Sequence, residues 1–281
     1  MPGVVIWANV IFLSVLDRSI KIDCPDRRVA PLLKAVFAPF ISRARRPIHF
    51  HCRIEPAAHG RGFVYVRNAR RRNARTLADL LFLFDKDLTI DLQKQRHDLF
   101  FVHAGVIEYR RSMIAFVAPS GTGKSTTVWA LLCAGLKYAG DELLPVDVDT
   151  LQVSPYPRAL CLKTAPSAPY GLPSTTLDTD GLFYIPTRTF KKAPSTKPRP
   201  LRTVFFLNRI PGSSHRARIR SLDTAEAGAR LYANALNALA HEGLGLDAAI
   251  SVAARVRCYE LQAGTLPDTV TAVRRFLSKA P

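Results

Sequence analysis

Residues 113–125 read MIAFVAPSGTGKS, an apolar run followed by a loop that contains two glycines and ends in a lysine and a serine. The apolar half, Met113–Val117, predicts a buried β-strand. The residues after Lys124 have amphipathic spacing and predict a helix. Because Gly121 and Gly123 let the backbone curl without steric penalty, successive N–H groups can point into the loop. This order of strand, glycine loop and helix is typical of a phosphate-binding loop.

The loop fits the Walker A pattern, with Ala118 where a glycine usually stands. The dipole at the start of the helix favours negative charge, Lys124 can reach the β- and γ-phosphates of a nucleotide, and the Ser125 hydroxyl can bind Mg²⁺. The residues expected to bind the nucleotide are Ser120, Gly121, Thr122, Gly123, Lys124, Ser125 and Thr126. ATP and Mg²⁺ are therefore the expected cofactors, and the alternative is a glycine-rich turn without a ligand.

Two adjacent carboxylates, Asp141 and Glu142, follow Lys124 by 17 and 18 residues, after one helix and a short strand over 136–140. At the end of that strand they are expected to lie beside the loop. Such a pair can divide its work, one carboxylate accepting a proton from a hydroxyl and the other helping to hold Mg²⁺. Without the loop, the same pair is more typical of a solvated strand end. His103, by its position alone, is more typical of a hydrogen-bonded core or edge residue.

The composition is that of a globular protein: 281 residues, 48% of them apolar and 22% charged, which excludes a disordered or fibrous chain. A net charge of +18 favours anionic partners without choosing among phosphorylated ligands, nucleic acid, acidic peptides and a membrane surface. The five cysteines are widely spaced and include no Cys-x-x-Cys pair. This spacing argues against disulfides and a thiolate zinc site and favours a reducing cytoplasm.

Hydrophobic periodicity predicts the remaining elements. The apolar run Val4–Leu16 lacks a basic flank and is too short to span a bilayer, so it predicts a strand or hairpin and no transmembrane segment, and the alternative is a targeting segment. The other expected strands are 19–22, 47–54, 62–66, 99–107, 113–118, 136–140, two within 143–156, 203–207 and 257–261. The expected helices are 30–41, one from 88 or 91 to 97, 124–134, 224–240 and 267–278. Residues 164–200, rich in Pro, Ser and Thr, predict a long loop that faces substrate.

Two basic clusters lie in the N-terminal part of the chain. Residues 67–75 hold five arginines, and Arg43, Arg45 and Arg46 form the second cluster. Both fit solvated loops, and the alternative is a landing site for an acidic partner or nucleic acid. Because no aromatic interleaving, RNP-like pattern or helix-turn-helix pattern supports base recognition, nucleic acid is not the expected partner.

Several segments together resemble the catalytic domain of HPr kinase/phosphorylase, and more closely the shorter HPr-kinase-related proteins found beside peptide-modification genes. The segments are FVHAGV at 101–106, the glycine loop, GLKYAGDE at 135–142, PYPRALCLK at 155–163 and CYEL at 258–261. The resemblance covers about residues 98–280. It implies an α/β (α+β) fold akin to phosphoenolpyruvate carboxykinase, with a P-loop on a mixed, strongly bent sheet. The expected domains are a small mixed α/β domain over 1–97 and a P-loop kinase domain over 98–281.

The resemblance also implies roles at matching positions. Asp141 would be the base that takes the proton from a serine hydroxyl, and Glu142, where the family usually has a second Asp, would assist Mg²⁺. His103 would sit near the transferring phosphate. Arg158 and Lys163 are candidates to neutralise charge as the phosphoryl group moves, and the alternative is that they are basic side chains flanking a strand.

One departure from the family bears on the substrate. The Glu-x-Arg-Gly-Leu-Gly signature of HPr kinase/phosphorylase is absent, and residues 164–192 contain no Glu. This absence counts against HPr as the substrate and against the reverse phosphorylase activity. Related kinases in lasso-peptide gene clusters phosphorylate a serine at the C-terminus of a precursor peptide, and the divergence suits such an acceptor better.

The leading hypothesis is a cytoplasmic serine kinase that uses ATP and Mg²⁺ and acts on a peptide or small protein, such as the precursor of a ribosomal natural product. The runner-up is a kinase for a small metabolite, free serine or a sugar, with residues 164–200 as a lid. The third is a nucleotide-binding regulator that binds nucleic acid through its basic N-terminal region. Whether the protein forms a homo-oligomer is left open. HPr kinases are hexamers, but no residue of this sequence indicates the same assembly.

Overall fold

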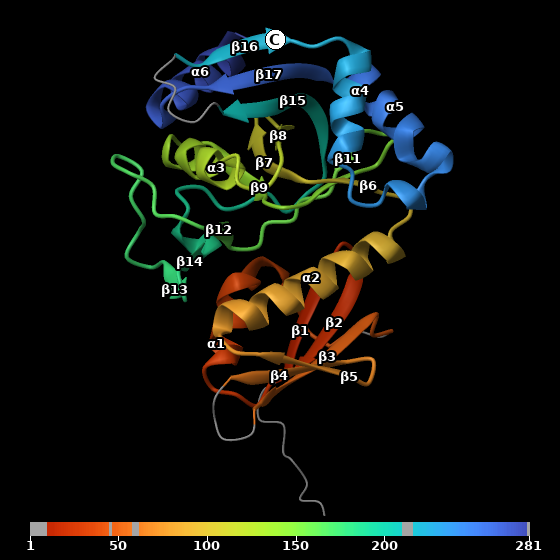
Figure 1. Cartoon of the computed structure of the whole chain (residues 1–281), viewed down its shortest axis with the longest axis vertical. Helices are drawn as coiled ribbons and strands as arrows, with labels where there is room; N and C mark the ends of the chain where they lie inside the picture. The colour runs from red at the N-terminus through yellow and green to blue at the C-terminus, as the bar shows by residue number, and fades with distance from the viewer. Residues whose placement is uncertain (1–9, 45–46, 58–61, 210–215, 280–281) are drawn as a thin grey trace, which may run out of the picture.

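The structure is a computed structural model that describes residues 10–44, 47–57, 62–209 and 216–279. Within these residues it is a mixed α/β fold with six α-helices and three β-sheets. One sheet has five strands and another has nine. Figure 1 shows the smaller of these two sheets with α1 and α2 at one end of the molecule and the larger sheet with the other helices at the opposite end. The expected mixed α/β class is confirmed, while the division into domains at residue 97 stays a prediction.

The N-terminal sheet has the order β1-β2-β3-β4-β5, and only β2 and β3 run parallel. Its strands are β1 (Val10–Val15), β2 (Arg18–Asp23), β3 (Phe50–Pro56), β4 (Phe63–Arg67) and β5 (Arg70–Ala74). Alternate residues of β1, namely Ile11, Leu13 and Val15, are buried, as expected for a strand with one covered face. The helices α1 (Val29–Val36) and α2 (Leu77–Gln95) share one hydrophobic core with these residues.

Both N-terminal helices differ in length from the expectation. α2 begins at Leu77 rather than at 88 or 91, because the Thr76 side chain caps it by accepting a hydrogen bond from the Asp79 N–H at 3.0 Å. α1 stops at Val36, before the expected end at residue 41, and the chain continues as a 3₁₀ turn over Ala38–Phe40 that contains Pro39. Residues 1–9 and 45–46 lie outside the described residues, so the start of the Val4–Leu16 run and part of the second basic cluster are not placed.

The arginine-rich segment 67–75, expected as a loop, is mostly a strand. β5 forms a hairpin with β4, and its turn residues Asn68 and Ala69 have φ angles of 47° and 61°. Arg67 and Arg72 form ion pairs with Asp91 and Asp87 on α2. Part of the basic charge of this segment is therefore neutralised inside the fold.

The large sheet has the order β6-β10-β11-β15-β8-β7-β9, and β17 adds to β15 and β16 to β17. Its strands are β6 (Phe100–Val102), β7 (Ala104–Tyr109), β8 (Ser112–Val117), β9 (Lys137–Gly140), β10 (Leu144–Val146), β11 (Gln152–Val153), β15 (Arg199–Arg209), β16 (Arg218–Ser221) and β17 (Arg257–Ala263). β8, β15 and β17 are parallel, and β9 runs in the direction of β8 because both are antiparallel to β7. The carboxyl ends of these four strands therefore point to the same edge.

Helices cover both faces of this sheet. Ile114 and Phe116 of β8 share a core with α3 (Lys124–Cys133) and α6 (Leu266–Lys279). Ala115 and Val117 of the same strand share a second core with α4 (Thr224–Ala233) and α5 (Leu246–Arg255). Because successive side chains of a strand point to opposite faces, these two cores lie on the two sides of β8.

Residues 164–200, expected as one long loop, contain a hairpin. β13 (Leu177–Thr179) and β14 (Leu182–Ile185) pair with each other, and β14 also pairs with β12 (Leu160–Leu162) to form a small antiparallel sheet. The hairpin turn is Asp180-Gly181, with φ angles of 53° and 87°, a pairing of residue types that suits tight turns. The loop expectation was therefore wrong for this part of the segment.

Two longer expected elements are also divided. The expected strand 99–107 breaks at His103, whose backbone N–H donates to the carbonyl oxygen of Asn234 at 2.9 Å, so β6 and β7 lie at different places in the sheet. The expected helix 224–240 ends at Ala233, and only Ala238–Ala240 returns to a 3₁₀ turn. α5 and β16 have no counterpart among the expected elements.

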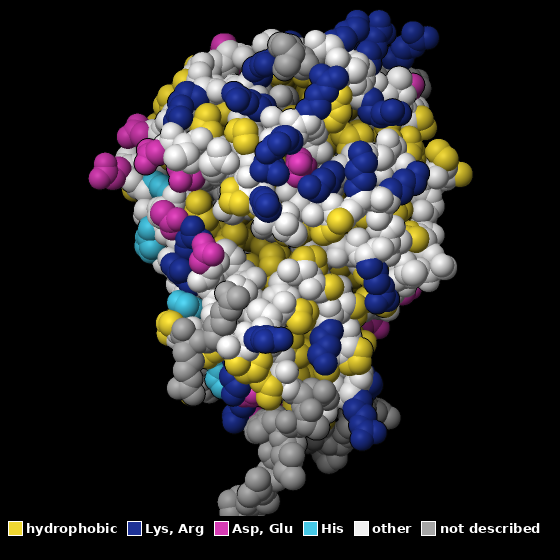
Figure 2. All heavy atoms as spheres, turned by 180° about the vertical axis from the view of Figure 1, so that it is seen from behind, with side chains coloured by type: hydrophobic (Ala, Val, Ile, Leu, Met, Phe, Trp, Pro, Cys, Tyr) yellow, Lys and Arg dark blue, Asp and Glu magenta, His cyan; other side chains and the backbone are white. Residues whose placement is uncertain are grey.

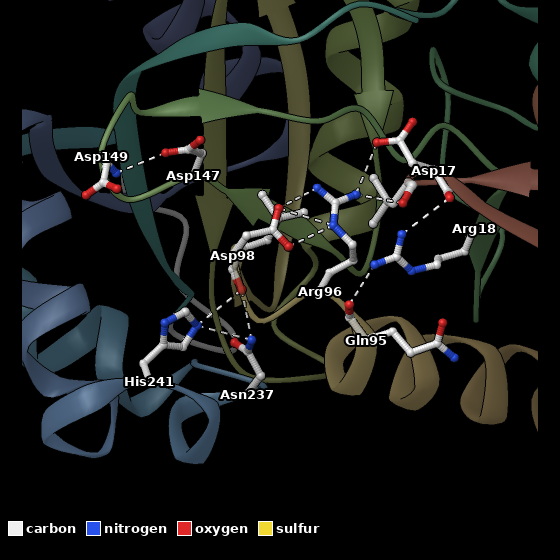
Figure 3. A network of polar contacts seen from close by, with 11 residues as sticks. Asp17, Arg18, Gln95, Arg96, Asp98, Asp147, Asp149, Asn237 and His241 are labelled. Atoms are coloured by element: carbon white, nitrogen blue, oxygen red, sulfur yellow. Dashed lines mark hydrogen bonds and ion pairs between the residues drawn. The ribbon is translucent and has the colours of Figure 1, made fainter. Parts of the chain in front are cut away.

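Polar contacts hold the link between the two large sheets (Figure 3). Arg18 Nη2 donates to the Gln95 carbonyl at 2.8 Å, and Arg96 Nη1 donates to the Leu16 carbonyl at 2.6 Å. On the other side, Asn237 donates to the Leu99 carbonyl at 2.9 Å and accepts from the Phe101 N–H at 2.9 Å. The link is thus tied to the β1–β2 turn and to the segment after α4.

Among the described residues, no helix combines the length and the apolar character needed to cross a bilayer.

Candidate active site

The glycine loop lies between β8 and α3, as the sequence predicts. Gly121 and Gly123 have φ angles of 86° and 101°, in the left-handed region that favours glycine, and Gly123 directly precedes α3. A Cβ placed on Gly121 would meet no atom within 4 Å, so the backbone conformation rather than space requires glycine there. The loop therefore has the conformation that aims N–H groups and a helix N-terminus at an anion.

Lys124 lies folded over this loop. Its side chain is buried, and its Nζ donates to the carbonyl oxygens of Ala118 at 2.7 Å and Pro119 at 3.2 Å. Burial lowers the pKa of Lys124, while the Glu142 and Asp141 carboxylates act in the opposite direction. The ammonium is thus held at the mouth of the loop, with the acid pair near enough to affect its charge.

Asp141 connects the acid pair to the loop. Ser125 Oγ donates to Asp141 Oδ2 at 2.9 Å, so the carboxylate lies beside the loop as expected from its place at the end of β9. Asp141 is fully buried, and its Oδ1 has no hydrogen-bond partner. Burial, followed by repulsion from Glu142, raises the pKa of Asp141 to about 6. A carboxyl group with such a pKa can exchange a proton near neutral pH.

Glu142 pairs with His103 instead of with the loop. The distance from His103 Nε2 to Glu142 Oε2 is 2.9 Å, and the Glu142 side chain is 41% exposed. The hydrogen bond from His103 lowers the pKa of Glu142 to about 2, against the effect of burial. Glu142 has a φ of 76°, unusual for a residue other than glycine. Because the backbone turns here, the successive carboxylates of Asp141 and Glu142 contact different partners, Ser125 and His103.

Arg158 and Lys163 lie in different surroundings. Lys163, just after β12, donates from Nζ to Ser120 Oγ at 3.1 Å and so reaches the loop. Arg158 is buried, and its Nη2 is 3.4 Å from Oδ2 of Asp85 on α2. Attraction to Asp85, then to Glu142, raises the pKa of Arg158 further, against the effect of burial. Lys163 can thus face a bound anion directly, while Arg158 acts on the acid pair from within the protein.

Thr122 and Thr126 were also expected to bind the nucleotide, and they make fewer contacts at the site. Thr122 Oγ1 donates to the Pro119 carbonyl at 2.9 Å and stabilises the loop. Thr126 is half-buried in the first turn of α3.

Two residues near the site had not been expected from the sequence. Arg209 ends β15, and its Nη1 is 3.7 Å from the position that a Cβ on Gly123 would occupy. It reaches the loop because β15 lies next to β8 and runs parallel to it, a pairing that no local pattern predicts. Asp85, the partner of Arg158, belongs to a part of α2 that was not expected to be helical.

The residues present fit Mg²⁺ and nucleotide phosphates. The orphaned, buried Oδ1 of Asp141, the Ser125 hydroxyl and Glu142 are hard oxygen donors of the kind that Mg²⁺ prefers. In the part of the chain that the structure describes, no group of three or more His, Cys, Asp and Glu side chains is arranged to hold a metal ion by itself. That pattern suits Mg²⁺, which usually combines one or two carboxylates with substrate phosphates.

Comparison with known proteins does not establish a family. No family model matches the chain, and no curated protein matches it. Among solved structures, the chain is similar to the HPr(Ser) kinase/phosphatase from Coxiella burnetii, with 12% sequence identity and a TM-score of 0.33. The match covers 64% of this chain and 99% of that one. A likeness of this size carries no functional argument.

Proposed function

We propose that this chain is a phosphotransferase that moves the γ-phosphate of ATP, with Mg²⁺, to a serine hydroxyl of a peptide or small protein. The observation that carries the proposal is the hydrogen bond from Ser125 to Asp141, because it joins a phosphate-binding loop to the buried member of an acid pair. A loop that only holds a nucleotide does not need a carboxylate with a raised pKa beside it.

The nucleotide would be held by the loop from Ser120 to Thr126. Its N–H groups and the start of α3 favour the phosphates, and three cations (Lys124, Lys163 and Arg209) each reach a different part of the loop. Ser125 and an acidic side chain would hold Mg²⁺, which neutralises charge on the β- and γ-phosphates. Phosphoryl transfer requires chiefly positioning and charge stabilisation, and these groups can supply both.

Asp141 is the proposed base for the acceptor hydroxyl. Its raised pKa makes it a stronger base than an exposed aspartate, and burial keeps water from competing for the proton. Glu142, with a pKa of about 2, is the weaker base and is assigned to Mg²⁺. His103 would orient Glu142 and face the transferring phosphate.

One observation favours a second assignment of the base. Asp141 is fully buried, whereas Glu142 is partly exposed and already bonded to His103. An acceptor can therefore reach the His103–Glu142 pair more directly, and Asp141 would then serve Ser125 and the metal. Under the first assignment Asp141→Asn removes the base. Under the second, His103→Ala lowers turnover at least as strongly, and added Mg²⁺ partly rescues Asp141→Asn.

The peptide acceptor comes from the sequence resemblance, and the small-metabolite kinase and the regulator remain the competing proposals. Intact-mass analysis after incubation with Mg²⁺ and ATP separates the three. The acceptors are HPr, a peptide ending in serine, and free serine, with Lys124→Ala as the control. We expect the peptide to gain about 80 Da, one phosphate, only with the wild-type protein.

The other outcomes contradict the proposal in distinct ways. Transfer to free serine but to no peptide would identify a metabolite kinase. ATP binding without transfer to any acceptor would favour the regulator. Transfer that persists in Lys124→Ala would show that the loop is not the nucleotide site.

A further inference from the structure

The two edges of the N-terminal sheet differ in what covers them. At the β1 edge, the Ser42 N–H donates to the Phe12 carbonyl at 2.9 Å, and Leu13 forms an isolated bridge with Ile41. At the other edge, β5 pairs with β4, and no further strand pairs with β5 among the residues that the structure describes. An open edge carries backbone groups that can hydrogen-bond to another strand.

The hairpin turn determines which backbone groups of β5 point outward. A two-residue turn, 68–69, closes the hairpin, so Arg70 forms backbone hydrogen bonds to the facing residue of β4. Bonded and non-bonded positions alternate along an antiparallel ladder, so Arg72 also bonds to β4. Arg71 and Asn73 therefore direct their N–H and C=O groups to the open edge. β5 thus offers two positions at which another strand can bind.

A groove of about 530 Å³ lies between the β4–β5 hairpin and α2. Arg70 and Arg72 line it from β5, because alternate residues of a strand share one face. Ile90 and Lys94 line it from α2, and both are exposed. A strand added to β5 would therefore direct every second side chain toward this groove.

Positive charge remains in the groove after its ion pairs are counted. The two aspartates that line it, both on α2, already pair with Arg67 and Arg72. Arg70 and Lys94, one from each wall, form no ion pair within the described part of the chain, and both are exposed. A segment with carboxylates at alternate positions would supply the missing counter-charge.

Each of these charges also has an ordinary explanation. Arginines on an edge strand prevent it from pairing with a second copy of the chain, because two such edges repel each other. Lys94 lies in the last turn of α2, where a cation interacts favourably with the helix dipole. Neither effect closes the edge to a strand of opposite charge. The charges therefore select an acidic partner and disfavour a copy of this basic chain.

We propose that β5 and the groove beside it bind an extended, acidic segment of the acceptor peptide, which adds to the N-terminal sheet as a further strand. This inference rests on the proposed function, because it treats the bound segment as part of a peptide that is phosphorylated elsewhere along its length. Backbone hydrogen bonds to Arg71 and Asn73 would supply affinity without regard to sequence. Arg70 and Lys94 would select acidic side chains, and Ile90 would contact an apolar one.

The first experiment measures peptide binding without nucleotide, so that it does not depend on phosphoryl transfer. The probe is a fluorescein-labelled peptide of alternating Glu and Val, about ten residues long, the length of a long strand. Its fluorescence anisotropy is followed with two variants at one position. Asn73→Pro removes the outward N–H, and Asn73→Ala removes the same side chain but keeps the N–H. An edge strand tolerates proline where its N–H faces solvent, so the pairing of β5 with β4 should persist.

We expect the peptide to bind the wild type and Asn73→Ala with affinities within about twofold of each other, and Asn73→Pro about tenfold more weakly. Equal affinities of the two variants would overturn the proposal, and so would absence of binding to the wild type. A single-stranded oligonucleotide that binds more tightly than the peptide, and equally to all three proteins, would also overturn it, because the basic edge would then serve nucleic acid.

The chain is basic elsewhere too, and Figure 2 shows Lys and Arg side chains gathered over the half of one face that contains the large sheet. Charge reversal separates the edge from this general attraction, and it serves as the test if Asn73→Pro does not fold. Arg70→Glu with Lys94→Glu should weaken the Glu–Val peptide about tenfold or more and permit binding of a Lys–Val peptide. Arg27→Glu with Lys34→Glu, at two exposed cations of the N-terminal region, should change the affinity by less than about twofold. Equal losses in the two double variants would overturn the proposal.

A transfer assay distinguishes failure of this proposal from failure of the proposed function. It compares two peptides that end in serine, one of them joined to the Glu–Val segment by a flexible Gly–Ser linker. The segment should lower KM about tenfold and leave kcat unchanged, and Asn73→Pro should remove the difference. Transfer to both peptides with equal KM would overturn this proposal and leave the proposed function standing. Binding of the segment without transfer to either peptide would contradict the proposed function and support the edge as a peptide site.

Discussion

The two ends of α3 both gather positive charge, but they differ in what faces it. At the amino end, Lys124 lies near the buried Asp141 and the partly exposed Glu142, and Ser125 bonds to Asp141. At the carboxyl end, five basic side chains and one acidic side chain, Glu108, line a cavity of about 810 Å³, and Glu108 is already paired with Lys137. Carboxylates placed among cations can hold Mg²⁺ and accept a proton, whereas cations without carboxylates can only bind an anion. The difference confines the proposed chemistry to the amino end.

The largest effect should come from removing the buried acid at the amino end. We expect Asp141→Asn to lower kcat at least about a hundredfold, the ordinary contribution of a general base. Because the base must be deprotonated, kcat/KM of the wild-type protein should rise with pH through about 6, the pKa of Asp141. The measurement is a pH–rate profile of both proteins, with Asp149→Asn, an exposed loop aspartate, as the control. A variant within a few-fold of wild type would show that Asp141 is not the base.

The same substitution should stabilise the protein, because burial of the charged carboxylate opposes folding. The pKa of Asp141 is about 6 in the folded state against 3.8 ordinarily, so the folded state binds the proton more tightly. The contribution of Asp141 to stability is then fully present below pH 3.8 and is lost as pH rises through 6.

Asn does not titrate, so we expect Asp141→Asn to gain on the order of 2–3 kcal/mol in unfolding free energy at pH 7. The gain should nearly vanish at about pH 4, where Asp141 is protonated in the folded protein. Urea unfolding at both values measures it. A variant equally destabilised at both values would mean that Asp141 is well stabilised in its charged form.

A smaller effect should follow from the arginine that β15 brings to the loop. We expect Arg209→Ala to weaken Mg²⁺–ATP binding about tenfold, the loss of one hydrogen bond to a charged group. Arg202→Ala, an exposed arginine on the same strand seven residues earlier, should change the affinity by less than about twofold. Calorimetric titration compares the two. Equal losses of affinity would mean that Mg²⁺–ATP binding at the amino end of α3 depends only on net charge, as it would on any basic surface.

Local features of the sequence predicted the parts of the site that depend on local structure. The strand Met113–Val117, the two glycines and the helix after Lys124 are neighbours in the chain, and each residue type matches its conformation. The proximity of Asp141 to the loop also followed, because only one helix and one strand intervene. The roles of these residues stay predictions.

Long-range pairing could not be predicted in the same way. Arg209 reaches Gly123 only because β15 pairs with β8, and strand order leaves no mark on the sequence of either strand. β5 was missed because its polar residues resemble a loop, and it exists through its hairpin with β4. The start of α2 did have a signal, the Thr76 cap three residues before Asp79, which the periodicity of the later residues obscured.

The left-handed backbone at Glu142 has a consequence for laboratory evolution of this protein. A φ of 76° disfavours a glutamate by roughly 1–2 kcal/mol relative to glycine. Glu142→Gly would relax the backbone, but it would also delete the partner of His103, whose hydrogen bond stabilises the charged glutamate in the folded state. A library at position 142 screened for heat resistance alone would therefore keep glutamate only if the contact with His103 outweighs the cost of the left-handed backbone.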